Sequence, residues 1–198
     1  MKKAHFYLLP VAVLCLASCR PTTQQSTTDD TPVDTLPPTL IPDSTLWGHL
    51  GEGTGMSVLE FITDAGDTLE VYRTNQLTGQ DGILSGDIRV ASDHFAVTLQ
   101  NDGASLLTAI NVSQLTQHWT NDNGSLDIRP DGSITSQGQA YNGWSLWNGH
   151  ILLSSEQQHE YARVTRIDTM DILSLGHDSL IIRDHLGQLI HLSRKKVH

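Results

Sequence analysis

Histidine has the widest chemical range of any side chain in this sequence, and it occurs ten times. Imidazole is both a common metal ligand and the most frequent general base. His159-Glu160 could begin a helical zinc motif, but the second histidine that this motif needs is missing. His185 and His191 could face each other across a hairpin, with His177 as a conceivable third ligand, yet this spacing is generic. The sequence therefore predicts no metal site and no cofactor.

Two glycine-containing stretches match catalytic motifs in part. Gly143-Trp144-Ser145 has the start of a nucleophile elbow but lacks the second glycine and the strand-turn-helix context. Ser145 is therefore interpreted as an outward-facing strand residue. Gly51-Glu52-Gly53-Thr54-Gly55 is followed by a strand-like run at residues 57–62, where a phosphate loop would need the N-terminus of a helix. We expect no catalytic residues and no enzymatic activity.

Tyr141, Trp144 and Trp147 form the densest aromatic cluster in the sequence. Trp144 and Trp147 are three residues apart, so on a straight strand their rings face opposite sides. Packing in a core is the favoured interpretation, because large aromatic side chains are mostly buried. The alternative is that the outward ring forms a platform for a sugar, a peptide or a partner protein. These three residues are candidates for lining a ligand cavity.

The first residues of the sequence have the pattern of an export signal. They come before the strands that would position these aromatic side chains. Lys2 and Lys3 give a positively charged start, and residues 6–16 form an apolar run of 11 residues. This run has the length of a signal-peptide core and is too short to span a bilayer. The small residues Ala17 and Ser18 follow, as a cleavage site requires. We predict a signal peptide over residues 1–18.

The sequence Leu16-Ala17-Ser18-Cys19 resembles the lipobox of bacterial lipoproteins. The resemblance implies that Cys19 receives a diacylglyceryl group on its sulfur and, after cleavage, an acyl chain such as palmitate on its amine. Several acyl chains on one residue would hold the chain stably on a lipid bilayer. The alternative is a plain secreted protein. Since the chain has two cysteines and Cys15 lies in the signal peptide, the mature protein would have no internal disulfide.

Residues 19–44 are predicted to form a disordered tether. They contain five of the seven prolines and almost no apolar residue before Leu36, so they cannot bury enough surface to fold. The triplets around Thr35 and Ser44 resemble the Asp-Ser/Thr-apolar sequon for O-glycosylation in some Gram-negative anaerobes, which makes these two residues candidate sugar acceptors. Asn111-Val112-Ser113 matches the N-glycosylation pattern, but we expect no sugar there in a bacterial lipoprotein.

The remaining residues, 45–198, carry the pattern of an all-β, antiparallel protein. Short runs alternate apolar and polar residues, for example Phe95, Val97 and Leu99, which is the period of a half-buried strand. Turn signals separate these runs; they include Asp81-Gly82, Asn101-Asp102-Gly103, Asn123-Gly124, Asp131-Gly132, Asn142-Gly143, Asn148-Gly149 and Leu186-Gly187. Many short strands joined by tight turns favour a barrel or a sandwich.

The stretch from Trp119 through Tyr141-Asn142-Gly143-Trp144 to the apolar run Ile151-Leu152-Leu153 resembles the lipocalin-like domains of small bacterial lipoproteins. The resemblance continues to residues 178–182 and covers residues 116–198. It implies a small up-and-down β-barrel in which Trp119, on the first strand, plugs one end. The longer lipocalin signature on the following strands is not visible in this sequence.

Residues 45–115 are expected to form a separate small β-barrel, of OB-like or SH3-like shape. The competing possibility is one continuous sheet system through both halves, because Trp47 and Trp119 open the two regions in a similar way. Residues 104–115 contain the best helical pattern of the chain, although they suit a strand equally well.

The chain carries 22 acidic and 12 basic residues, a net charge of −10, which makes a nucleic-acid partner unlikely on electrostatic grounds. The leading hypothesis is a non-enzymatic lipoprotein whose C-terminal domain binds a small apolar ligand. A structural or interaction module that contacts another envelope protein is the alternative, and an uncharacterised enzyme comes third. The start Cys19-Arg20-Pro21-Thr22 has no acidic run, which favours the periplasmic side of the outer membrane.

Overall fold

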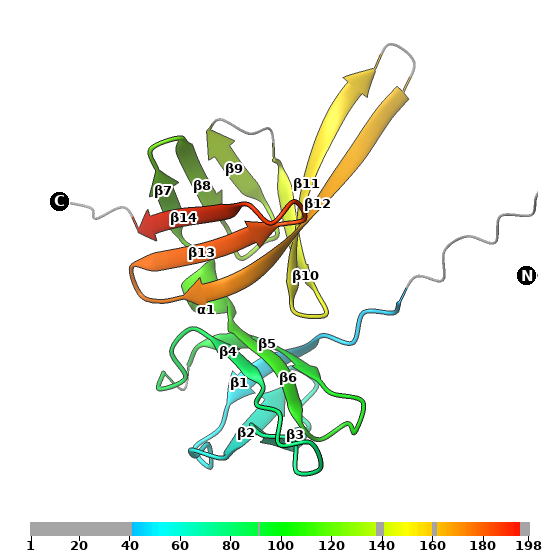
Figure 1. Ribbon diagram of the computed structural model, residues 1–198, viewed down its shortest axis with the longest axis vertical. Coiled ribbons are helices and arrows are strands. Elements are labelled where there is room, and N and C mark those ends of the chain that lie inside the picture. Colours follow the sequence, from blue (N-terminus) through cyan, green and yellow to red (C-terminus); the bar gives the residue numbers. More distant parts are fainter. Residues whose placement is uncertain (1–40, 91, 138–140, 160–161, 195–198) are drawn as a thin grey trace, which may run out of the picture. The chain divides into compact units, whose positions relative to one another are not determined.

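The computed structural model describes residues 41–90, 92–137, 141–159 and 162–194. The predicted signal peptide, Cys19, Thr35 and most of the tether lie outside the described residues. The described part is built from strands arranged in two sheets, with one short helix between them (Figure 1). The all-β prediction is therefore confirmed, and the strands form two sheets rather than the one continuous sheet system that was the competing possibility. Among the described residues, no helix has both the length and the apolar character needed to cross a membrane.

The first sheet has six strands in the order β3-β2-β1-β5-β6-β4. Their bounds are β1 Leu46–Leu50, β2 Val58–Thr63, β3 Thr68–Tyr72, β4 Ile83–Ser85, β5 His94–Leu99 and β6 Leu106–Asn111. Residues 104–115 thus supply a strand first, and then the helix α1 at Val112–Leu115. Both alternatives for this segment were partly correct.

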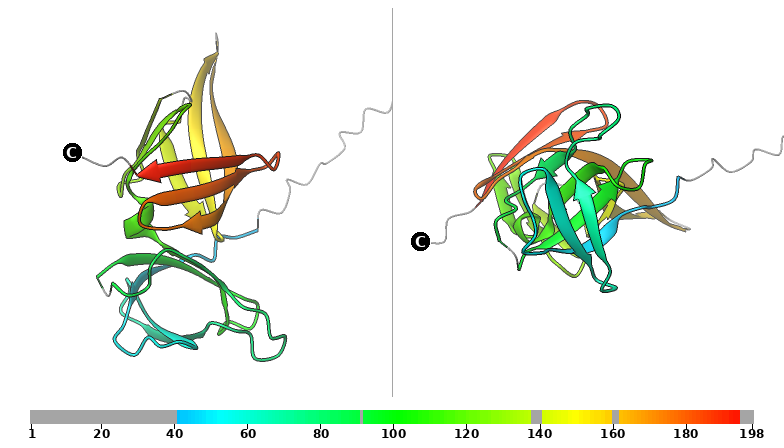
Figure 2. Two further views of the ribbon diagram at one scale, coloured as in Figure 1. Left: turned by 60° about the vertical axis from the view of Figure 1, so that its left-hand side comes forward. Right: turned by 90° about the horizontal axis from the view of Figure 1, so that it is seen from below.

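The first sheet curls round so that the end of β3 meets the chain just before β6 (Figure 2). Tyr72, at the end of β3, bridges to Ser105 just before β6, and the Tyr72 N–H donates to the Ala104 carbonyl at 2.9 Å. Paired strands are antiparallel except β4 and β6, which run parallel. β5, which lies between them in the chain, pairs antiparallel with the other edge of β6.

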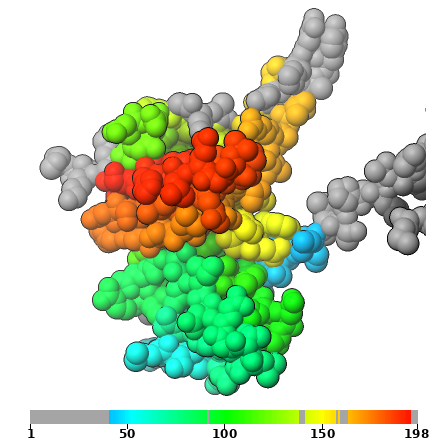
Figure 3. All heavy atoms as spheres, viewed as in Figure 1, coloured from blue at the N-terminus to red at the C-terminus, as the bar shows by residue number. Residues whose placement is uncertain are grey.

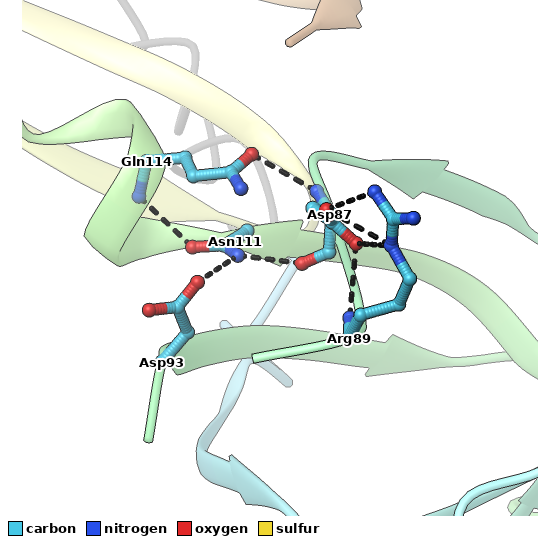
Figure 4. A network of polar contacts seen from close by, with 5 residues as sticks. All are labelled: Asp87, Arg89, Asp93, Asn111 and Gln114. Atoms are coloured by element: carbon cyan, nitrogen blue, oxygen red, sulfur yellow. Dashed lines mark hydrogen bonds and ion pairs between the residues drawn. The ribbon is translucent and has the colours of Figure 1, made fainter. Parts of the chain in front are cut away.

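A network of polar contacts fixes the loop between β4 and β5 to the start of α1 (Figure 4). Asn111 is fully buried, and its Nδ2 donates to the Asp87 carbonyl at 2.7 Å and to Asp93 Oδ2 at 2.6 Å. Its Oδ1 accepts from the Gln114 N–H and so caps the helix. The Asp87 N–H in turn donates to Gln114 Oε1. With every polar group of its amide engaged, Asn111 has no room for a sugar.

The second sheet has eight strands in the order β10-β11-β12-β13-β14-β7-β8-β9, all paired antiparallel. Their bounds are β7 His118–Asn121, β8 Gly124–Ile128, β9 Ile134–Gln137, β10 Gly143–Trp147, β11 His150–His159, β12 Ala162–Leu175, β13 Ser179–Asp184 and β14 Leu189–Arg194. The two end strands, β9 and β10, meet at a bridge between Ser133 and Gly143. This sheet is therefore a nearly closed eight-stranded barrel.

The β11–β12 hairpin continues past its neighbours in the barrel (Figure 1). β10 pairs with β11 only as far as Ser154, and β13 pairs with β12 only from Met170. In the space-filling view, β13 and β14 form an unbroken surface on the face turned towards the viewer (Figure 3). The hairpin exposes apolar side chains in this extension, since Val164 is 46% exposed and Ile167 is 58% exposed.

The buried side chains form two clusters. The smaller one lies in the first sheet and includes Phe61 and Phe95. The larger one fills most of the barrel and also includes Ile110 and Leu115, which belong to β6 and α1. Residues 41–198 accordingly form one compact unit, and whether residues 45–115 fold as a separate domain stays a prediction.

The end of the predicted tether is ordered against the barrel. The β10–β11 hairpin turns at Asn148 and Gly149, both with positive φ, which is the geometry that favours Asn-Gly. Ser44 Oγ donates to Asn148 Oδ1 at 2.7 Å, and Asn148 Nδ2 donates to the Pro42 carbonyl at 3.1 Å. Glycosylation of Ser44 stays a prediction; in this structure its hydroxyl is exposed and hydrogen-bonded.

We expect the substitution Asn111→Ala to destabilise the protein by about 2–3 kcal/mol, because it leaves the Asp93 carboxylate, the Asp87 carbonyl and the Gln114 N–H without a partner. Urea unfolding followed by tryptophan fluorescence measures this change. The matched control is Asn101→Ala in an exposed turn, which should change the free energy of unfolding by less than about 0.5 kcal/mol. Equal midpoints for the two variants would contradict the structural role of Asn111.

Candidate ligand-binding site

The barrel contains a cavity of about 140 Å³, lined by six apolar side chains and by six polar or glycine residues. The residues that line it come from seven of the eight strands, all except β10, and from the turn between β7 and β8. The lining residues are Asn121, Asn123, Gly124, Ser125, Leu126, Ser136, Gln137, Leu153, Met170, Ile182, Ile190 and Leu192. An apolar cavity of about 150 Å³ is large enough to hold a benzene molecule. The cavity is thus suited to a small apolar group and is below the roughly 300 Å³ at which pockets for larger ligands begin.

A wider polar hollow of about 530 Å³, here called the mouth, adjoins this cavity. The two spaces share Asn121, Asn123, Met170 and Ile190 as lining residues. The side chains that line only the mouth are mostly polar or charged and include Asp122, Tyr141, Arg166, Asp168, Asp184, His185, Gln188 and His191. A ligand in the mouth can therefore reach the apolar cavity with one end.

Along strand β12, the lining side chains change from polar in the mouth to apolar in the cavity. Alternate residues on a strand share a face, so Arg166, Asp168, Met170 and Ile172 lie in a row on one side of β12. Met170 and Ile172 are buried in the barrel core, and Asp168 is only 8% exposed. Arg166 is exposed at the outer end of the row. The residues in the row thus become less polar with depth.

Asp168 is the buried carboxylate at the junction of the mouth and the core. Its Oδ2 accepts a hydrogen bond from the Tyr141 hydroxyl at 2.8 Å, and its Oδ1 accepts one from Arg166 Nε at 3.0 Å. Burial, followed by the hydrogen bond to Asp168 and its negative charge, raises the pKa of Tyr141 to about 12. Tyr141 therefore stays a neutral donor at physiological pH and satisfies a charge that would otherwise be costly to bury.

Of the four aromatic residues singled out in the sequence, only Tyr141 lines the mouth. Trp119 is fully buried, and its Nε1 donates to the Leu115 carbonyl of α1 at 2.8 Å; its role as the plug of the barrel stays a prediction. Trp144 is buried with its Nε1 bonded to the Arg129 carbonyl, whereas Trp147 is half-buried. The two indoles thus differ in burial, as the strand alternation predicts.

Sequence reasoning missed Arg166, Asp168 and Met170. A signal was available, because these positions alternate with Ile167 and Thr169 in the sequence. This alternation does not show by itself that Asp168 faces inward. Charged residues that alternate with apolar ones normally mark the outer face of a strand.

Histidine and aspartate also pair on the outside of the barrel. His150 Nδ1 lies 2.8 Å from Asp171 Oδ1, and Arg183 Nη2 donates to the other oxygen of Asp171 at 2.7 Å. The three residues are direct neighbours across β11, β12 and β13. Hydrogen bonds from Arg183 and then His150 lower the pKa of Asp171. This arrangement is a cross-strand ladder that links three strands.

His185 and His191 both line the mouth. Within the described ranges, no three histidine, cysteine, aspartate or glutamate side chains are grouped so that they could hold a metal ion.

These features define an all-β protein with a nearly closed antiparallel barrel, whose interior cavity opens into a polar mouth. No protein-family model and no curated protein matches the chain. Among solved structures, it is similar to the crystal structure of a lipocalin-like protein from Bacteroides thetaiotaomicron, with 21% identity and a TM-score of 0.34. The similarity covers 41% of this chain and 97% of that protein. The strand order and pairing of the chain itself define the fold.

We predict that the Tyr141 phenol ionises near pH 12 rather than near its ordinary pKa of 10.0. The difference in phenolate absorbance between the native protein and Tyr141→Phe, followed as the pH is raised, measures this value. Because the pKa in the folded chain lies above that in the unfolded chain, the contribution of Tyr141 to stability is present below pH 10 and is lost as the pH rises towards 12.

Asp168→Asn serves as the comparison for this titration. It should lower the pKa of Tyr141 only in part, because burial, the larger cause of the shift, remains. Ionisation of Tyr141 near pH 10 in the native protein would show that Tyr141 is neither buried nor bonded to Asp168 as described.

Proposed function

We propose that this chain is an exported lipoprotein whose eight-stranded barrel binds a small apolar molecule. The observation that carries the proposal is the apolar cavity lined by Leu126, Leu153, Met170, Ile182 and Leu192, together with its opening into the mouth. Burying the apolar part of a ligand there stabilises the complex by about 25 cal/mol for each Å² removed from water. The proposal includes no enzymatic activity.

In this proposal the lipid bilayer is the second partner, held through acylated Cys19. The signal-like residues 1–18 and the position of Cys19 directly after Leu16-Ala17-Ser18 support this anchor. The absence of acidic residues in Arg20-Pro21-Thr22 favours the periplasmic face of the outer membrane. The tether would then carry the barrel away from the lipid surface.

An interaction module of the cell envelope is the second candidate function. The barrel interior is largely filled by its own side chains, and the cavity is small. Val164 and Ile167 are exposed on the extended β11–β12 hairpin, where a partner protein could cover them. A failure of the barrel to bind any small apolar probe would favour this function.

Met170 provides a built-in probe of ligand binding. It lines both the cavity and the mouth, whereas Met56 is 91% exposed on the loop between β1 and β2 of the first sheet. In protein labelled with ¹³C on the methionine methyl groups, addition of benzene or toluene should shift the Met170 signal and leave the Met56 signal unchanged. An unshifted Met170 signal at saturating probe would contradict a ligand-binding barrel.

We expect Leu153→Phe to weaken binding of these probes by roughly tenfold or more, because the larger ring occupies part of the cavity beside Met170. The matched control is Leu152→Phe, one residue earlier on β11, where the side chain belongs to the other face of the strand. It should keep the native affinity in the same methyl titration. Equal affinities for both variants would place the bound probe elsewhere.

The anchor is tested by Cys19→Ser expressed in a bacterial host. We expect the native protein to incorporate labelled palmitate and to sediment with the membranes, and the variant to lose both properties. Cys15→Ser is the control, since Cys15 lies in the predicted signal peptide and should leave lipidation unchanged. Retention of label in Cys19→Ser would overturn the lipoprotein proposal.

A further inference from the structure

The mouth is lined by three carboxylates, Asp122, Asp168 and Asp184, and by one guanidinium, Arg166. Two of the three carboxylates are held in place by hydrogen bonds from the protein. Both oxygens of Asp168 accept hydrogen bonds, from Tyr141 and from Arg166. Oδ1 of Asp184 accepts the N–H groups of Leu186 and Gln188 at 2.9 and 2.8 Å, which closes the β13–β14 turn. These two carboxylates are therefore structural elements of the mouth.

The hydrogen-bond donors that line the mouth have fewer partners within the protein. Arg166 uses Nε to reach Asp168, and its side chain is 58% exposed. A guanidinium has five N–H donors, so four remain at the terminal nitrogens, and no acceptor contacts them among the described residues. Asn121 and Asn123 line both the mouth and the cavity, and their amides can also donate. Asp122, between them, lines the mouth but not the cavity.

The distance between these donors and the cavity sets the size of a ligand. Arg166 and Met170 lie on the same face of β12, four residues and hence about 13 Å apart along the strand. An extended arginine side chain can cover part of that distance. A compact molecule could therefore place an apolar group beside Met170 and a polar group beside Arg166.

We propose that the barrel selects small carboxylic acids, with an apolar body about the size of a benzene ring in the cavity and the carboxylate held by Arg166 in the mouth. This inference rests on the proposed ligand-binding function and narrows it to one chemical class. Arginine is suited to this role because its planar fork can bind both oxygens of a carboxylate. Asp168 is then a positioning residue, which fixes the guanidinium through Nε while its terminal nitrogens remain available.

The cavity also limits which acids can bind. Its volume of about 140 Å³ accommodates a single small ring or a short branched chain. A long acyl chain would exceed that space, so the ligand class differs from long-chain fatty acids and phospholipids.

The test compares three ligands of nearly equal size that differ in charge, namely benzoate, benzyl alcohol and benzylamine. Their dissociation constants are measured from the shift of the Met170 methyl signal, with Met56 as the internal reference. We expect benzoate to bind roughly tenfold more tightly than benzyl alcohol, as one charge-assisted contact in a partly exposed site allows. Benzylamine should bind more weakly than benzoate, because an ammonium group cannot pair with the Arg166 guanidinium.

Arg166→Gln should remove the preference for benzoate and leave the affinity for benzyl alcohol within about twofold, because it removes the guanidinium and keeps the cavity. Arg163→Gln is the matched control; it removes the same charge from an exposed position three residues earlier on β12, and it should keep the preference. Adding salt should weaken the binding of benzoate to the native protein and to this control.

The outcomes separate the two proposals. If none of the three ligands shifts Met170, the ligand-binding function fails and the carboxylate inference fails with it. If benzyl alcohol or benzylamine binds as tightly as benzoate, or if Arg166→Gln keeps the preference, the carboxylate inference is overturned while the ligand-binding function stands. If palmitate shifts Met170 more strongly than benzoate at equal concentration, the limit on ligand size is wrong.

Discussion

The register between β11 and β12 is the constraint on which the candidate site depends. Side chains alternate between the two faces of a strand, so a slip of one residue would turn Asp168 and Met170 outward and bring Ile167 and Thr169 into the barrel. Ten residue pairs join the two strands, from His150 with Asp171 to His159 with Ala162. This long ladder keeps a charged residue and an apolar residue on the same inner face.

Contacts on both faces of the barrel hold that register. On the outer face, Asp171 binds His150 on one neighbouring strand and Arg183 on the other. On the inner face, Asp168 binds Tyr141, and a buried carboxylate in any other register would lose this partner. Since an unpaired buried charge costs several kcal/mol, the polar end of the cavity also helps to specify the fold. The site and the stability of the barrel are thus coupled through the same carboxylate.

The size of the apolar cavity depends on how completely side chains fill the barrel. A small barrel fills its interior with side chains, and space for a ligand is left only where the filling is incomplete. Trp119, Ile151 and Leu180 are almost fully buried in this core, which also includes Val112 and Leu115 of α1. The remaining space lies beside Met170 and next to the mouth. Its small size follows from the large side chains around it and sets the size of ligand that the barrel can accept.

The sequence by itself determined the all-β class, the turns and the location of the strands. These features depend on local rules, such as the alternation of Phe95, Val97 and Leu99 and the positive φ that Asn148 and Gly149 adopt in a tight turn. Only the tertiary structure decided which polar residues converge. Tyr141 and Asp168 are 27 residues apart and meet because the barrel closes, and the burial that raises the pKa of Tyr141 exists only after closure. Local patterns contain no information about such distant pairings, so the aromatic residues were visible in the sequence while the carboxylate and the arginine beside them were not.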